Sequence, residues 1–249
     1  MFRPNEWQYG LRNVLRRGGI EIARTREISG FHALHISKLF TVCEPDVVLD
    51  VGARIGEFGL WARRNGYRGR IISFEPVSSN YEALARRASG DGRWDVYNYA
   101  LGAEEGESDI NVTQDSMFSS FLMPNAYAEK EFGSGARVSR TERVGVRRLD
   151  AVFEEVVAPL KDPRVFLKMD TQGWDLQVLA GADGCLSHID AFQSEVSVQA
   201  IYEGMPNLAA SLAEFERRGF AISGLFPVNL DSQLRVVEFD CVVVRDDRR

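Results

Sequence analysis

The segment from Asp50 to Gly56 has the residue types and spacing of a loop that binds a small cofactor. It reads Asp-Val-Gly-Ala-Arg-Ile-Gly, and its glycines allow the backbone to approach a ligand closely. A dinucleotide-binding loop would need a second glycine where Arg54 stands, and a P-loop would need a Gly-Lys-Ser or Gly-Lys-Thr sequence, which does not follow Gly56. The remaining D-x-G-x-x-x-G pattern favours a ligand without phosphate groups.

S-adenosylmethionine (SAM) is such a ligand, and we expect it as the cofactor. Its amino acid end needs a carboxylate that accepts hydrogen bonds from its ammonium group, which Asp50 can supply. It also needs free backbone N–H groups for its own carboxylate, which the glycine loop can supply. The expected cofactor contacts of this segment are Asp50, Gly52, Ala53, Arg54, Gly56 and Phe58.

Glu75 ends the next expected strand, which reads Arg-Ile-Ile-Ser-Phe-Glu. In a doubly wound sheet, an acidic residue about twenty residues after the glycine loop faces the nucleoside, and its carboxylate can accept hydrogen bonds from both ribose hydroxyls. The alternative is an exposed carboxylate at a strand end. Because Glu75 follows the loop at the expected distance, we interpret it as the ribose ligand.

A second group of chemically capable residues lies in two later strands. Lys168, Asp170 and Glu195 place charge in strands that should be buried on both faces, so these charges must be paired or used. One interpretation is an ion pair between Lys168 and Glu195, with Asp170 capping the helix near Trp174. The other places Asp170 at the carboxyl end of a central strand, where ligands bind in such sheets.

In the second interpretation, Lys168, Asp170 and Glu195 are the candidate catalytic residues. Asp170 would orient or deprotonate an acceptor hydroxyl, because an alcohol is a poor nucleophile unless a base or a metal engages it. Asp170 and Glu195 could also bind a divalent cation such as Mg²⁺, but two carboxylates are few for a metal site, and Lys168 competes for Glu195. We therefore rank direct action by Asp170 above a metal and assign no metal ligand.

Four motifs follow one another along the chain in a specific order. They are D-V-G-A-x-x-G-x-F from Asp50, F-E-P from Phe74, A-L-G from Ala100 and L-K-M-D-x-x-G from Leu167. This set resembles the FkbM family of SAM-dependent methyltransferases over about residues 47–244. The resemblance implies an O-methyltransferase that acts on a hydroxyl of a sugar, glycolipid or secondary metabolite. It also implies that Ala100 and Leu101 lie beside the adenine ring.

The chain departs from the common family pattern at two positions. Arg54 stands where the family commonly has Asn, and Gln172 stands where it commonly has Glu, which puts any role for a charge at position 172 in doubt. These departures motivate a second hypothesis, a SAM-binding protein without turnover that has a regulatory or scaffolding role. A third hypothesis, a nicotinamide-dependent oxidoreductase, is disfavoured by Arg54 at the second glycine position.

Strands and helices alternate from Val47 onward, which predicts an α/β fold with a doubly wound, mostly parallel sheet. The expected sheet has seven strands, of the class I methyltransferase or Rossmann-like type, and its last strand is antiparallel. We expect one domain over residues 1–249, with a helical cap at 1–45 and an insertion at 114–142 that interrupts the alternation. The insertion carries aromatic residues beside the cofactor edge, where acceptor recognition is expected.

The first 45 residues show two helical pieces. Trp7, Leu11 and Val14 fall at helical spacing with arginines beside them. Peripheral contact with a membrane surface is one interpretation of this pattern, and a helix packed on its own domain is the commoner one. The second piece carries His32 and His35, which we expect to face solvent and not to bind a metal, because no third ligand lies nearby. We expect this segment to close over the cofactor or the acceptor.

Composition and charge limit the partners and the cellular compartment that we expect. A net charge of −6 and a pI of about 5.3 argue against nucleic acid as a partner. No run approaches the roughly 18 apolar residues of a transmembrane helix, and the start lacks a signal-peptide region. Cys43, Cys185 and Cys241 have the spacing of reduced thiols, so we expect a cytoplasmic protein. The expected partner is a small-molecule or glycan acceptor, and the oligomeric state stays open.

Overall fold

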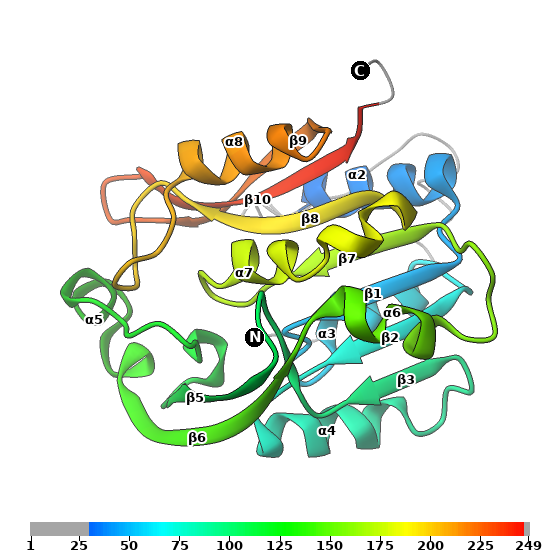
Figure 1. Cartoon of the computed structure of the whole chain (residues 1–249). Helices are drawn as coiled ribbons and strands as arrows, with labels where there is room; N and C mark the ends of the chain where they lie inside the picture. The colour runs from blue at the N-terminus through cyan, green and yellow to red at the C-terminus, as the bar shows by residue number, and fades with distance from the viewer. Residues whose placement is uncertain (1–29, 247–249) are drawn as a thin grey trace.

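The computed structural model describes residues 30–246 and is built around a seven-stranded β-sheet (Figure 1). The strand order is β3-β2-β1-β7-β8-β10-β9. The strands are β1 (Val47–Val51), β2 (Arg70–Phe74), β3 (Trp94–Tyr97), β7 (Val165–Met169), β8 (Ile189–Ser197), β9 (Phe220–Leu230) and β10 (Val236–Arg245). The five strands from β3 to β8 in this order pair in parallel, whereas β10 is antiparallel to both β8 and β9. The predicted sheet is confirmed.

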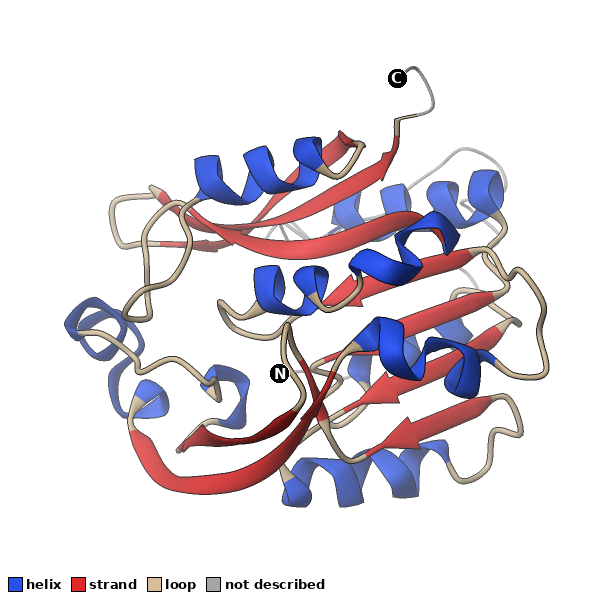
Figure 2. Ribbon diagram, in the orientation of Figure 1, coloured by secondary structure: helices blue, strands red, loops and turns tan. Residues whose placement is uncertain are grey.

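Helices cover both faces of this sheet (Figure 2). One face carries α2 (Gly30–Cys43), α3 (Glu57–Arg64) and α4 (Ser78–Ala88), and the other carries α6 (Leu149–Val157), α7 (Asp175–Ala180) and α8 (Leu208–Arg217). Successive side chains of a strand point to opposite faces. Val48 therefore shares an apolar cluster with Ala62 of α3, whereas Leu49 shares one with Phe153 of α6. The doubly wound arrangement is confirmed.

Between β3 and β7 the chain forms a second sheet of three strands, in the order β4-β6-β5. These are β4 (Ala100–Leu101), β5 (Gly106–Thr113) and β6 (Val138–Arg147). The predicted insertion supplies η1 (Ser116–Phe118), α5 (Ala126–Phe132), η2 (Gly133–Ala136) and the start of β6, and η3 (Asp183–His188) leads into β8. Ala128 and Ala136 share a small apolar cluster with Ile201 and Tyr202. The insertion is thus anchored to the connection that follows β8.

One helix start differs from the sequence pattern. The spacing of Ser79 and Glu82 predicts a capping box, but α4 begins at Ser78, and its start makes no such bond. Glu142 of β6 instead accepts hydrogen bonds from the backbone N–H of Ser78 at 2.8 Å and from its hydroxyl at 2.6 Å. The prediction is wrong because a carboxylate from another strand satisfies the helix start. At α8, by contrast, the N-cap residue Asn207 accepts a hydrogen bond from the N–H of Ala210 at 3.0 Å.

Helix α2 lies on the sheet and does not line the cavity described below. Ile36 and Leu39 bury its apolar side. The prediction of solvent-facing histidines is wrong, because the sheet offers them partners: His32 Nε2 lies 3.0 Å from Gln193 Oε1, and His35 Nε2 lies 2.8 Å from the hydroxyl of Ser223. The predicted basic helix near residues 7–15 lies outside the described residues.

The turn after β1 requires glycine at position 52. Gly52 has a φ of 74°, and a β-carbon added there would lie 2.1 Å from the carbonyl oxygen of Asp170. The backbones of the β1 and β7 ends therefore approach each other more closely than any side chain permits. This contact joins the two strand ends that carry the predicted cofactor loop and the predicted catalytic carboxylate.

We predict that Gly52→Ala lowers the free energy of unfolding by about 2–5 kcal/mol, because it adds backbone strain and a steric clash with a main-chain atom. Gly66→Ala is the matched control: Gly66 has a φ of 95° but no atom within 4 Å of the added carbon, so only the strain of about 1–2 kcal/mol applies. Urea unfolding measures both. Equal losses in the two variants would contradict the close approach.

Candidate active site

A cavity of about 540 Å³ opens at the carboxyl ends of β1, β2 and β7. Its size lies within the range of roughly 300–1,000 Å³ that is typical of small-molecule sites. One wall is formed by the loop after β1 and the end of β2, another by the ends of β7, β8 and β10, and a third by the insertion. Ligands bind at this edge in doubly wound sheets.

Part of the predicted glycine loop lines this cavity. The lining residues from this segment are Gly52, Ala53, Arg54 and Phe58. Arg54 has a positive φ of 49°, and its backbone N–H donates a hydrogen bond to Glu75 Oε2 at 2.7 Å. Gly56 lies outside the lining, and a β-carbon added there would lie 2.8 Å from a methyl carbon of Leu84. The role of Gly56 is therefore to let α3 pack against α4.

Asp50 lies beneath the cavity wall. Its side chain is completely buried, and the cavity lining does not include it. Oδ2 accepts a hydrogen bond from the hydroxyl of Ser73 at 3.3 Å, and Oδ1 faces the ammonium of Lys168 at 3.6 Å. The prediction that Asp50 directly binds the ammonium group of SAM is wrong, because the Asp50 carboxylate is buried outside the cavity lining and pairs with Lys168.

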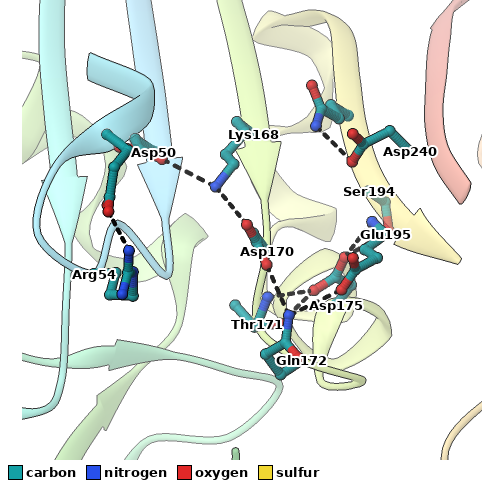
Figure 3. A network of polar contacts seen from close by, with 12 residues as sticks. Asp50, Arg54, Lys168, Asp170, Thr171, Gln172, Asp175, Ser194, Glu195 and Asp240 are labelled. Carbon is teal, nitrogen blue, oxygen red and sulfur yellow. Dashed lines mark hydrogen bonds and ion pairs between the residues drawn. The ribbon is translucent and has the colours of Figure 1, made fainter. Parts of the chain in front are cut away.

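Lys168 pairs with Asp50 and Asp170, so the predicted ion pair with Glu195 is wrong (Figure 3). The distance from Nζ to Asp170 Oδ2 is 3.0 Å. Strand register explains the choice: Asp50 stands opposite Lys168 on β1, and Gln193 stands opposite it on β8. Burial acts to lower the pKa of Lys168, but the two carboxylates outweigh burial and raise it. The ammonium therefore stays charged.

Asp170 is the accessible member of this network, with 43% of its side chain exposed. Burial acts against its ionisation, but the ammonium of Lys168 and the hydrogen bonds from Lys168 and Gln172 outweigh burial and lower the pKa of Asp170. Its carboxylate is therefore ionised at neutral pH and lines the cavity.

Asp170 does not cap α7, whose start has no side-chain cap hydrogen bond, and the neighbouring carboxylate of Asp175 has a different role. This buried carboxylate accepts hydrogen bonds from the N–H of Thr171 at 2.9 Å, from the hydroxyl of Ser194 at 2.7 Å and from the N–H of Glu195 at 3.0 Å. Asp175 ties the loop after β7 to β8. The capping prediction for Asp170 is wrong, because its two carboxylate oxygens face Lys168 and Gln172 and the start of α7 has no side-chain cap.

Glu195 lines the cavity and meets Asp170 through the amide of Gln172. Gln172 Nε2 lies 2.9 Å from Glu195 Oε2 and 3.1 Å from Asp170 Oδ1. Burial, and then the neighbouring carboxylates of Glu238 and Asp170, raise the pKa of Glu195 well above its ordinary value. The site therefore pairs a carboxyl group whose ionisation is disfavoured with one whose ionisation is favoured.

Glu75 is buried in the cavity wall, so the alternative of an exposed strand-end carboxylate is wrong. It is 4% exposed, and its Oε1 accepts hydrogen bonds from the N–H of Val77 at 3.0 Å and the amide of Asn80 at 3.4 Å. Burial raises the pKa of Glu75 to about 7, although the hydrogen bonds from Val77 and Arg54 act to lower it. The carboxylate both anchors the glycine loop and lines the cavity.

Ala100 and Leu101 form the short strand β4 and line the apolar part of the cavity. Both are buried, and Phe74 and Ile110 line the same part. Small and apolar side chains suit the face of an aromatic ring. Contact with adenine stays a prediction, and the position of both residues is consistent with it.

Two cavity carboxylates of β10 were not predicted. Glu238 accepts hydrogen bonds from the hydroxyl of Ser197 at 3.0 Å and the amide of Asn229 at 3.1 Å, and burial raises the pKa of Glu238 to about 7. Asp240 accepts from Gln193 Nε2 at 2.8 Å, and burial raises its pKa as well. The sequence did carry a signal for both residues, since these two acidic side chains lie two positions apart in the mostly apolar β10.

The insertion forms the third wall. Its lining residues are Ser116, Met117, Phe118, Ser119, Phe121 and Phe132. Arg54 of the glycine loop donates to the hydroxyl of Ser116 at 3.5 Å, so loop and insertion meet across the cavity. Acceptor recognition by this segment stays a prediction.

Two further properties concern residues 30–246. In this part of the chain, no group of three or more histidine, cysteine, aspartate and glutamate side chains is arranged to hold a metal ion. No helix in the same range has the length and apolar character needed to cross a bilayer.

We predict that the ligand-free protein loses stability as pH rises from about 4.5 to about 7. Glu75 and Glu238 have pKa values raised from 4.5 to about 7, so in this window the folded state binds more protons than the unfolded state, and stability falls with increasing pH. Above about pH 8 these groups are ionised in both states, and their contribution is flat. Urea unfolding at pH 5, 6, 7 and 8 measures the slope.

Glu238→Gln is the informative variant, because Ser197 and Asn229 can hydrogen-bond to an amide as well as to a carboxyl group. It should remove its share of the slope, on the order of 3 kcal/mol between pH 5 and pH 8. A slope identical to that of the original protein would contradict the raised pKa of Glu238.

Comparison with known proteins agrees with the fold and the motifs. AMB antimetabolite synthetase AmbE of Pseudomonas aeruginosa is 26% identical, over 82% of this chain and 11% of that protein. Methyltransferase sdnD of Sordaria araneosa is 27% identical, over 55% of this chain and 60% of that protein. The chain thus spans about a tenth of the length of the first relative and 60% of the second.

A solved structure and a family profile complete the comparison. The crystal structure of a candidate O-methyltransferase from Klebsiella pneumoniae superimposes with a TM-score of 0.51 at 9% identity, over 99% of this chain and 91% of that chain, which shows a shared fold. The profile of the methyltransferase FkbM domain matches residues 50–222, more than half of the chain. The resemblance is confirmed: the chain belongs to the methyltransferase FkbM domain family.

Proposed function

We propose that this protein is a SAM-dependent O-methyltransferase that acts on a hydroxyl group of a sugar, a glycolipid or a secondary metabolite. The observation that carries the proposal is a single cavity that joins the glycine loop and Glu75 to the ionised carboxylate of Asp170. A cofactor and an acceptor can therefore share one enclosed space. Membership in the FkbM family supports the same chemistry.

The residues of the cavity fit SAM. Glu75 offers a carboxylate to the ribose hydroxyls, and Ala100 and Leu101 offer apolar surface to the adenine. Carboxylates outnumber the cations Arg54 and Lys168 along the cavity. This excess of negative charge favours a sulfonium cofactor with net positive charge and disfavours the pyrophosphate of a nicotinamide cofactor.

When bound, SAM would supply a methyl group activated by its sulfonium sulfur. Asp170 would accept a hydrogen bond from the acceptor hydroxyl and take up its proton during methylation. A carboxylate with a lowered pKa suffices for this task, because the hydroxyl proton becomes strongly acidic as the oxygen gains its new bond to carbon. Lys168 keeps Asp170 ionised and thus ready to accept the proton.

The insertion would contact the acceptor. Phe118, Phe121 and Phe132 offer aromatic faces, and Ser116 and Ser119 offer hydroxyl groups. This combination suits a sugar ring or a comparable polar metabolite, which has both apolar faces and hydroxyl edges. The names of the two relatives, an antimetabolite synthetase and a methyltransferase, are consistent with a small secondary metabolite.

Calorimetric titration with SAM and with its demethylated product tests cofactor binding. Incubation of the protein with labelled SAM and a cell extract, followed by identification of the labelled product, tests transfer and names the acceptor. Binding without transfer across a broad panel of acceptors would favour the SAM-binding regulatory or scaffolding protein. No binding of either compound would overturn the proposal.

We predict that Glu75→Ala weakens SAM binding by about 1.5–3 kcal/mol, or roughly 10- to 150-fold in Kd, because hydrogen bonds to a charged group are lost. The measurement is calorimetric titration. Glu75 also accepts hydrogen bonds from the backbone of Arg54 and Val77, so we expect a loss of ligand-free stability as well.

Glu142→Ala is the matched control for this loss of stability. Glu142 accepts hydrogen bonds from Ser78 at the start of α4 but lies outside the cavity. It should lower the melting temperature and leave the SAM affinity unchanged. An affinity of Glu75→Ala equal to that of the control would refute the ribose role.

We predict that Asp170→Asn binds SAM normally while turnover falls by about 10²- to 10⁴-fold, the range for a lost acid–base group. The amide keeps the shape of the side chain but cannot take up the proton. Turnover should not respond to EDTA, since Asp170 acts directly in this mechanism.

The control is Asp109→Asn on the exposed side of β5, where the carboxylate only meets Arg143, and it should retain full turnover. Near-normal turnover of a well-folded Asp170→Asn protein would show that the base lies elsewhere. Loss of turnover of the original protein in EDTA would favour the metal alternative.

A further inference from the structure

Gln172 joins the two cavity carboxylates Asp170 and Glu195 (Figure 3). Its Nε2 lies 3.1 Å from Asp170 Oδ1 and 2.9 Å from Glu195 Oε2. An amide NH₂ group has two N–H donors, so one nitrogen can serve both carboxylates. The side chain thus fixes the two groups relative to each other without adding a charge.

Tyr202 fixes the direction of this amide. Its side chain is 1% exposed, and its hydroxyl lies 2.8 Å from Gln172 Oε1 and 3.0 Å from the carbonyl oxygen of Phe118. Burial, and then the carboxylate of Glu195, raise the pKa of Tyr202, so the hydroxyl keeps its single proton and shares it between Gln172 Oε1 and the carbonyl oxygen of Phe118. A reversed amide would turn Oε1 toward the ionised Asp170, which has no hydrogen to donate.

The backbone of Gln172 adopts a conformation that is rare for residues other than glycine. Its φ is 54°, which costs about 1–2 kcal/mol. The carbonyl oxygen of Gln172 accepts a hydrogen bond from the hydroxyl of Ser120 at 2.7 Å. Strain of this kind persists only where the surroundings hold it, and it gathers at functional sites. Here it directs the amide at the two carboxylates.

Charged and titratable groups approach the pair from every neighbouring element. They are Asp50 of β1, Arg54 of the glycine loop, Lys168 of β7, Asp175 of α7, Tyr202 after β8, and Glu238 and Asp240 of β10. Lys168 contacts Oδ2 of Asp170, whereas Gln172 contacts Oδ1. Within residues 30–246 Glu195 forms no ion pair, and its side chain accepts a hydrogen bond from Gln172.

We infer that Gln172 is a positioning residue that holds Asp170 ready to receive the proton of the acceptor. The inference rests on the proposed function, because it concerns the proton released in methyl transfer. Asp170 starts as a carboxylate and ends as a carboxylic acid. In the same step the acceptor oxygen gains the methyl group and loses its proton, and the sulfonium becomes a neutral thioether.

Gln172 also links Asp170, which would take up the proton, to the insertion, which would contact the molecule that is methylated. Ser120 and Phe118 belong to the insertion. Ser120 donates a hydrogen bond to the carbonyl oxygen of Gln172, and Phe118 is connected to Gln172 through the hydroxyl of Tyr202. Seating of an acceptor against the insertion therefore bears on the alignment of Asp170.

The test compares Gln172→Gly with Gln172→Glu. Glycine suits the positive φ, so this variant should fold while lacking the amide. Asp170 then loses a hydrogen bond that lowers its pKa, and we expect the acid limb of the kcat profile to move to higher pH by roughly one unit. Glutamate places a third carboxylate beside the pair, so the shift should be larger. The affinity for SAM should stay unchanged in Gln172→Gly, which adds no charge to the cavity.

A second readout needs no cofactor and no acceptor. Between pH 5 and pH 8, the ligand-free Gln172→Glu protein should lose more stability than the original protein, because three carboxyl groups must ionise together. Tyr202→Phe tests the orientation of the Gln172 amide, because it keeps the amide but removes the hydroxyl that donates to Gln172 Oε1. Its acid limb should move in the same direction by less than that of Gln172→Gly.

An acid limb and a ligand-free stability profile that match the original protein in both Gln172 variants would overturn the inference, even if kcat falls. Unchanged profiles with a lower kcat are what a merely structural role would produce. Failure of the proposed function is distinguishable: the original protein would not transfer methyl groups, while the ligand-free profiles would still report whether Gln172 governs the carboxylate pair.

Discussion

The rest of the site depends on the two ion pairs that the ammonium group of Lys168 forms with Asp50 and Asp170. A buried and unpaired ammonium costs several kcal/mol, and here Asp50 on β1 and Asp170 at the end of β7 offset that cost. The ion pairs tie the strand that carries the glycine loop to the strand that presents the ionised carboxylate. The close approach of Gly52 to the Asp170 backbone makes the same junction tight. The two halves of the site are therefore aligned before any ligand binds.

Negative charge is concentrated around this junction at an energetic cost. Burial raises the pKa values of Glu75, Glu195 and Glu238, so the cavity resists full ionisation at neutral pH. A positively charged ligand would lower that cost, and the carboxylates would in turn stabilise the ligand. The electrostatics and the proposed sulfonium cofactor are thus mutually consistent. The same charge would repel a phosphate-bearing cofactor.

The insertion forms one wall of the cavity and is the segment proposed to contact the acceptor. Its helix α5 packs against Ile201 and Tyr202, which follow β8, and its residues Ser120 and Phe118 meet the loop after β7 through Gln172 and Tyr202. The acceptor wall is therefore in contact with the residues proposed to handle the proton. In the proposed function, changes in this segment would alter the choice of acceptor without disturbing the sheet.

Much of this arrangement was predictable from short stretches of sequence. The apolar run of β1, the glycines after it and the acidic end of β2 are local patterns, and the carboxyl ends of parallel strands share one edge, so Glu75 and the glycine loop could be assigned to one site. The partners of the charges required three-dimensional packing. Lys168 chooses Asp50 over Glu195 because of strand register, and a slip of one residue would change its neighbours. Glu238 and Asp240 enter the cavity because β10 runs antiparallel beside β8. The direction of the Gln172 amide depends on Tyr202, 30 residues later in the chain, and no local pattern encodes a contact between side chains that distant.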